Sequence, residues 1–108
     1  RIIKPFIGLQ YVMLNKELQK KYSLPTDFGA MVVRDHTPGA VAIVPGSPAE
    51  KAGVKENDII LELNGEKLTE QADFSDTLQK CKVGEKVELT VTRGDKNFKL
   101  IATLEERK

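Results

Sequence analysis

The sequence predicts an α+β fold that is mainly β, a small and partly open barrel of about five to six strands capped by two or three helices. Several short apolar runs alternate with polar residues, as half-buried strands do. Turns rich in Gly, Pro, Asn and Asp separate these runs, and a few segments carry the start and stop signals of short helices. Many short strands with polar turns are typical of small barrels.

The N-terminal half is predicted to hold strands around one short helix. A strand is expected over residues 8–13, and Asn15 is well placed to cap a helix over residues 16–22. The apolar runs AMVVR (30–34) and AVAIV (40–44) are expected to form a hairpin, with its turn at Thr37-Pro38-Gly39.

The segment GSPAEKAGV, residues 46–54, predicts one complete short helix. Ser47 is a good N-cap, Pro48 suits the first helical position, and Glu50 stands where a capping-box acid belongs. Gly53 fits the left-handed residue that ends many helices.

The C-terminal half predicts a strand, a helix and a final hairpin. The run DIILEL is expected to be a buried strand that ends in the turn Asn64-Gly65. Residues 70–81 predict an amphipathic helix with an apolar stripe at i, i+4 and i+7. The alternating runs KVELTVTR and FKLIATLE predict a hairpin. The helical stripe consists of Phe74, Leu78 and Cys81.

Length and composition limit the classes of protein. A chain of 108 residues suits one domain, here residues 1–108 with a core over about 4–104. The 17 basic and 16 acidic residues are interspersed, so the net charge of +1 gives no reason to expect nucleic acid as a partner. No apolar run approaches the ~18 residues that span a bilayer, so direct membrane insertion is not expected. The first residue is Arg1, and we expect a domain excised from a longer chain.

No catalytic constellation is evident. His36, the single histidine, lies beside Asp35 in a turn, where a solvated side chain is the simpler interpretation than a general base. Ser47 lacks the second glycine of a nucleophile elbow, and its capping role explains it. Cys81 fits a buried small hydrophobe. One histidine and one cysteine do not make a zinc site, and no phosphate-binding loop is present, so neither metal nor cofactor is expected.

Gly8 interrupts an apolar strand, where glycine loses a packing side chain and adds backbone entropy to the unfolded chain. Such a glycine marks a bulge, a bend, or the close approach of another backbone or a ligand.

The run Phe6-Ile7-Gly8-Leu9, the block PGSPAEKAGVKENDIILELNG, and a later helix followed by two strands together resemble a PDZ domain. The resemblance is closest to the PDZ domains of HtrA/Deg serine proteases, in the permuted bacterial strand order. It covers about residues 4–104. It implies a module that binds C-terminal peptides by β-strand addition, a mode for which PDZ domains are a standard example.

The resemblance also implies a site. The amides of an aliphatic-Gly-aliphatic loop would bind the peptide carboxylate as an anion nest, with Lys4 as a possible charge assist. The peptide would pair with the following strand, opposite the groove helix. Gly8→Glu is then expected to abolish binding and leave the fold largely intact. The expected loop is Phe6, Ile7, Gly8 and Leu9; the strand is Gln10, Tyr11, Val12 and Met13; the helix contributes Gln71, Phe74, Ser75 and Leu78.

The expected partners are the C-termini of protein substrates with an apolar last residue, and a parent protease domain located in the cell envelope. Gln71 at the helix start predicts no strict hydroxyl preference two residues before the end. Compared with the family pattern, about eight extra residues around 34–41 lengthen the expected hairpin. Two alternatives stay open: a different host, such as a C-terminal processing protease, a site-2-type metalloprotease or a secretion component, and a scaffold domain that serves assembly only.

Overall fold

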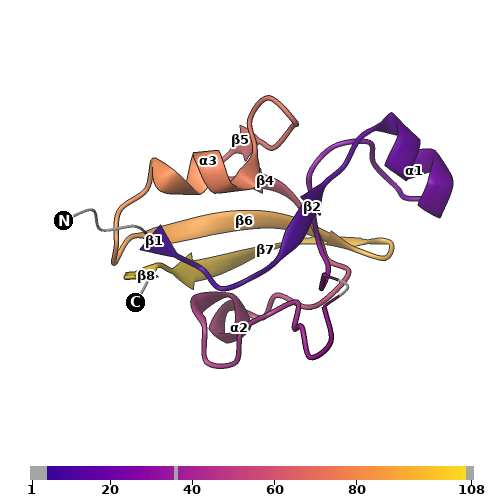
Figure 1. The fold of residues 1–108 in the computed structure, drawn as a ribbon. Helices are drawn as coiled ribbons and strands as arrows, with labels where there is room; N and C mark the ends of the chain where they lie inside the picture. The colour runs from indigo at the N-terminus through magenta and orange to yellow at the C-terminus, as the bar shows by residue number, and fades with distance from the viewer. Residues whose placement is uncertain (1–4, 36, 107–108) are drawn as a thin grey trace.

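The computed structural model describes residues 5–35 and 37–106 (Figure 1). The fold is mainly β with three helices. Within the described ranges, no helix combines the length and the apolar character needed to cross a bilayer. In chain order the elements are β1 (Pro5–Phe6), β2 (Tyr11–Met13), α1 (Lys16–Tyr22), β3 (Ala30–Val32), α2 (Pro48–Ala52), β4 (Ile59–Leu63), β5 (Glu66–Lys67), α3 (Phe74–Gln79), β6 (Lys86–Arg93), β7 (Lys96–Thr103) and β8 (Glu105–Glu106).

The six-stranded sheet is open. Its order is β2-β3-β4-β6-β7, with β5 paired to β4, and every neighbouring pair is antiparallel. The short strands β1 and β8 form a second sheet that brings the two ends of the described chain side by side. In Figure 1, α3 and α2 lie on opposite sides of β6 and β7, and α1 projects away from the rest. The expected open, helix-capped β fold is therefore confirmed.

The core is one cluster of aliphatic side chains with a single large aromatic ring. Phe74 of α3 is 1% exposed, and Leu63 and Leu89 from adjacent strands are equally buried. Cys81 and Phe98 pack against the cluster from its margin. The stripe of Phe74, Leu78 and Cys81 faces the core as expected, because an i, i+4, i+7 spacing keeps side chains on one helical face.

The helix α2 has the caps that its sequence predicts. Ser47 is the N-cap, and its Oγ accepts a hydrogen bond of 3.3 Å from the Glu50 amide. Pro48 occupies the first turn, and Gly53 ends the helix at φ 97°. The Glu50 carboxylate reaches back to the Gly46 amide at 2.8 Å rather than to the amide of the cap residue. The capping signals of α1 and the turn at Asn64-Gly65 are likewise present.

The hairpin expected between residues 30–34 and 40–44 is wrong. Strand β3 pairs with β2 on one side and with β4 on the other, so both of its edges are already occupied. The turn at Thr37 exists, since the Ala40 amide donates to the Thr37 carbonyl at 3.0 Å. The following segment instead makes an isolated bridge between Ile43 and Leu9.

Two predicted elements are shorter than expected. The strand expected over 8–13 is regular only from Tyr11, because Gly8 leaves the extended conformation at φ 85°. The helix expected over 70–81 begins at Phe74, because the side chain of Asp73 caps it by accepting from the Ser75 amide at 2.9 Å. Before the cap, Thr69 and Ala72 close a turn of their own.

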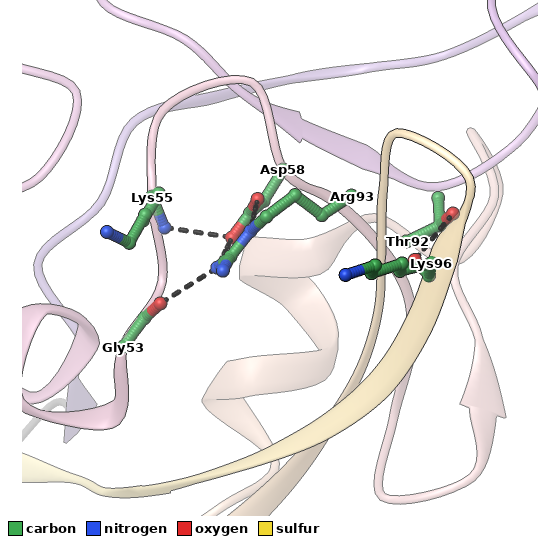
Figure 2. A network of polar contacts seen from close by, with 6 residues as sticks. All are labelled: Gly53, Lys55, Asp58, Thr92, Arg93 and Lys96. Atoms are coloured by element: carbon green, nitrogen blue, oxygen red, sulfur yellow. Dashed lines mark hydrogen bonds and ion pairs between the residues drawn. The ribbon is translucent and has the colours of Figure 1, made fainter.

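An ion pair between a buried carboxylate and a partly exposed guanidinium, 37% accessible at Arg93, connects the segment after α2 to the final hairpin (Figure 2). The guanidinium of Arg93 grips the carboxylate of Asp58 with two hydrogen bonds of 2.7 Å, and the Asp58 side chain is only 1% exposed. The same guanidinium donates to the Gly53 carbonyl at 2.9 Å, and the Lys55 amide donates to Asp58 at 2.8 Å. Residues 53–58 therefore depend on Arg93 of β6 for their position. The sequence analysis did not identify this contact.

Candidate functional site

The neighbours of Gly8 on the side that faces the protein interior leave no room for a side chain at this position. Its φ of 85° is a left-handed conformation that side chains disfavour. A β-carbon at this position would lie 2.3 Å from Ser47 Cβ and 3.1 Å from the ring of Phe6. The missing side chain thus allows the loop to approach the N-cap of α2. This contact argues against the expectation that Gly8→Glu leaves the fold largely intact.

The loop around Gly8 is held from behind by backbone hydrogen bonds. The Ala49 amide donates to the Ile7 carbonyl at 2.8 Å, and the Val44 amide donates to the Gly8 carbonyl at 2.8 Å. The Gln10 amide donates to Ala42 at 2.9 Å. Residues 42–49 therefore support the back of the loop.

The amides at the front of the loop have a different environment. Among residues 5–35 and 37–106, the N–H groups of Ile7, Gly8 and Leu9 donate to no protein acceptor. Buried amides in proteins are nearly always paired, so adjacent N–H groups without a protein partner indicate a place for water or an anion. Gly8 and Ile7 are buried as residues, with Ile7 3% exposed.

The strand that follows presents an open edge. Hydrogen bonds of Gly8 and Gln10 point inward, and Gln10 also accepts from the Val33 amide at 3.1 Å. Because backbone groups alternate sides along a strand, those of Leu9, Tyr11 and Met13 point the other way. Strand β2 is terminal in its sheet, so within the described residues this outward edge pairs with no strand.

A groove of about 200 Å³ runs between this edge and α3. One wall is the segment from Pro5 to Tyr11, and the other is α3. Buried aliphatic and aromatic side chains, including Leu78 at 6% exposure, form its floor. None of the described lining residues carries a charge. The lining consists of Pro5, Phe6, Ile7, Gly8, Leu9, Gln10, Tyr11, Val44, Phe74, Ser75, Leu78 and Gln79.

Tyr11 joins the two walls at one end of the groove. Its hydroxyl donates to Asp73 Oδ2 at 2.6 Å and accepts from the Ser75 amide at 3.0 Å. Its ring meets Phe74 edge-on, with 5.1 Å between centroids. Burial and the hydrogen bond to the Asp73 carboxylate raise the pKa of Tyr11 to about 12, so the phenol remains protonated at neutral pH.

Most of the residues that the sequence analysis selected surround the groove. The expected loop residues line it, as do Gln10, Tyr11, Phe74, Ser75 and Leu78. Val12 and Met13 continue the β2 edge beyond the lining. Gln71 does not line the groove; it precedes the Asp73 cap and faces a second hollow beside α1. Lys4 and His36 lie outside the described residues.

Sequence reasoning missed Pro5, Val44 and Gln79 in the lining. Gln79 follows Leu78 on α3, where a helical-wheel projection of the shorter helix would have placed it near the groove. No sequence pattern indicated that Val44 lines the groove, because the sequence analysis places its segment in a hairpin.

Two further groups of side chains were expected from the sequence to have no chemical role, a metal site and Cys81. Within it, no three His, Cys, Asp or Glu side chains lie close enough together to hold a metal ion. Cys81 is half-buried with its sulfur near the Thr77 carbonyl, and burial raises the pKa of its thiol, which disfavours the nucleophilic thiolate.

Comparison with known proteins identifies relatives of this arrangement. The chain is 33% identical over 107 residues to a probable periplasmic DegP-like serine endoprotease of Marinomonas, covering 99% of this chain and 21% of that protein. It is 32% identical over 109 residues to the serine protease HTRA1 of Xenopus tropicalis, covering 95% and 22% respectively. The chain thus spans about a fifth of the length of these curated relatives.

Solved structures share the fold. The HtrA-type protease AlgW with a decapeptide matches with a TM-score of 0.77 at 19% identity, over 98% of this chain and 30% of that one. The HtrA3 PDZ domain bound to a phage-derived ligand, FGRWV, matches with a TM-score of 0.73 at 22% identity, over 98% and 89%. The family profile described as PDZ domain matches residues 5–104. The chain therefore belongs to the PDZ domain family.

Proposed function

We propose that this domain binds the C-termini of other polypeptides by adding them as a strand to the outer edge of β2. The observation that carries the proposal is the set of amides at Ile7, Gly8 and Leu9, which find no protein acceptor in the described chain and stand at the head of an uncharged groove. Several backbone N–H groups on one carboxylate form charge-assisted hydrogen bonds, which are stronger than neutral ones.

The rest of the groove suits the residues before the carboxylate. The outward backbone groups of Leu9, Tyr11 and Met13 offer a ladder to an extended peptide. Ile7 and Leu78 are aliphatic and buried beside the amides, so the last side chain is expected to be apolar, such as Val, Leu, Ile or Phe. Because a free peptide loses conformational entropy on binding, the affinity should be micromolar, about −8 kcal/mol.

Binding to a matched pair of peptides tests the carboxylate. A pentapeptide that ends in valine is compared with the same peptide carrying a C-terminal amide, using fluorescence polarisation. Since hydrogen bonds to a charged group contribute about 1.5–3 kcal/mol, the amide should bind at least about tenfold more weakly. Equal affinities of the two peptides would show that the carboxylate is not recognised. The absence of binding by either would favour the scaffold that serves assembly only.

We further infer that the domain recognises substrates or regulates activity for an HtrA-like serine protease of the cell envelope. Support comes from the curated relatives, which are serine proteases, several of them named as periplasmic. In the full-length protein, a groove-binding peptide should change the cleavage rate of a reporter substrate, while its amidated form should not. An identical rate with both peptides would contradict a regulatory role.

A further inference from the structure

Two front amides of the loop belong to peptide units whose carbonyls are held from behind. In a trans peptide unit the N–H and the C=O point in opposite directions. The Ile7 carbonyl accepts from the Ala49 amide at 2.8 Å, so the N–H of the same unit, on Gly8, points away from α2. The Gly8 carbonyl accepts from the Val44 amide at 2.8 Å, so the Leu9 N–H points away from residues 42–44. The contacts behind the loop therefore set the direction of both N–H groups.

The backbone conformation of Gly8 brings these two N–H groups to the same side. Successive N–H groups of an extended strand point to opposite edges. Gly8 leaves the extended conformation at φ 85°, so the two carbonyls both turn toward the supporting residues and the two amides both turn away from them. Successive N–H groups that converge in this way form a concavity that suits an anion.

The first turn of α2 leaves one amide to hold the loop. Of the first three helical residues, Pro48 has no N–H, and the Glu50 amide donates to Ser47 Oγ at 3.3 Å. The remaining amide belongs to Ala49, a completely buried residue, and it donates to the loop. The capping arrangement of α2 thus assigns one specific donor to the back of the candidate site.

Hydrogen bonds in a chain polarise one another, by about 10–30% per bond. An N–H group whose own peptide carbonyl accepts a hydrogen bond is therefore a stronger donor. We propose that the backbone amides of Ala49 and Val44 are positioning groups for carboxylate binding. Through the loop carbonyls, they aim and polarise the N–H groups of Gly8 and Leu9. This inference rests on the proposed function, and it extends the site to two amides behind the loop that do not themselves touch the carboxylate.

Ester substitution of the backbone tests this role, because it removes one N–H group and keeps the side chain. Ala49 is replaced by lactic acid in one variant, and Val44 by α-hydroxyisovaleric acid in another. Each variant is titrated with the pentapeptide that ends in valine and with its C-terminal amide. The ratio of the two affinities should fall about two- to fivefold relative to the unmodified domain, because the front N–H groups are less well aimed and less polarised. A general loss of affinity or stability affects both peptides and cancels in the ratio.

Replacement of Gly53 by glycolic acid is the matched control. The Gly53 amide donates to the Glu50 carbonyl at 3.1 Å, so this ester weakens the far end of α2 without removing a contact to the loop, and the affinity ratio should stay unchanged. An unchanged ratio in both the Ala49 and the Val44 esters, or an equal fall in the Gly53 ester, would overturn the positioning role. Failure of the proposed function has a different signature: the unmodified domain would bind the free acid and the amide equally, and the positioning role would fall with it.

Discussion

At the scale of single residues, Gly8 allows the loop to pack against the residues behind it. The loop could present its amides only if it lies against the N-cap of α2, and a β-carbon 2.3 Å from Ser47 Cβ prevents that approach. Glycine in the candidate site is therefore needed for structure first. Any effect of a substitution on binding would follow from a displaced loop.

Gly8→Ala should destabilise the domain by about 3 kcal/mol, because the left-handed backbone costs ~1–2 kcal/mol and overpacking adds ~1–3 kcal/mol. Urea denaturation measures the change. Gly84→Ala is the matched control, since Gly84 has a similar φ of 88° with no atom near a β-carbon, and it should cost only about 1 kcal/mol. Equal losses in the two variants would mean that the contact with Ser47 does not matter.

At the scale of elements, the ends of helices and strands follow local chemistry, whereas their docking depends on distant partners. The N-cap of α2 depends only on the four residues from Ser47 to Glu50. The segment after α2 is different, because its carbonyl and carboxylate are held by Arg93, 35 positions from Asp58. This ion pair holds the segment after α2 against β6.

Arg93→Ala should cost about 2 to 4 kcal/mol of unfolding free energy, because it leaves the buried Asp58 carboxylate without its cation. Lys99→Ala on the neighbouring strand β7 is the control. Its ion pair with Glu88 is exposed, with side chains 64% and 41% accessible, so removing it should cost less than about 1 kcal/mol. Chemical denaturation of both variants measures the loss of unfolding free energy. Similar small losses in the two variants would show that the Asp58–Arg93 pair contributes little to stability.

At the scale of the whole molecule, the core and the groove share side chains. Leu78 belongs to the core cluster and also lines the groove, as does Phe74. The floor of the groove is thus part of the densely packed interior. A rigid floor of this kind favours binding, since little of the site has to be ordered when a peptide arrives.

Leu78→Ala should therefore lower both stability, by about 2–5 kcal/mol, and peptide affinity, by about five- to tenfold. Leu89→Ala removes a fully buried leucine that does not line the groove, so it should lower stability and leave affinity unchanged. Denaturation and peptide titration are run on both variants under conditions where each is folded. A loss of affinity in both would indicate that binding merely follows stability.

Most residues around the groove were predicted through the resemblance to PDZ domains. The sequence by itself determined the local features: the caps of α1 and α2, the turn at Asn64-Gly65 and the final hairpin. Their signals lie within a few neighbouring positions, where propensity and capping act directly. Only the tertiary structure shows which strand edges are already paired with other strands. Because both edges of β3 are paired, residues 40–44 do not pair with it. Helix α3 begins at Phe74 with Asp73 as its cap, which leaves Gln71 outside it, and Tyr11 meets Asp73 across 62 positions. These outcomes depend on groups that meet only when distant segments pack, and no local pattern records them.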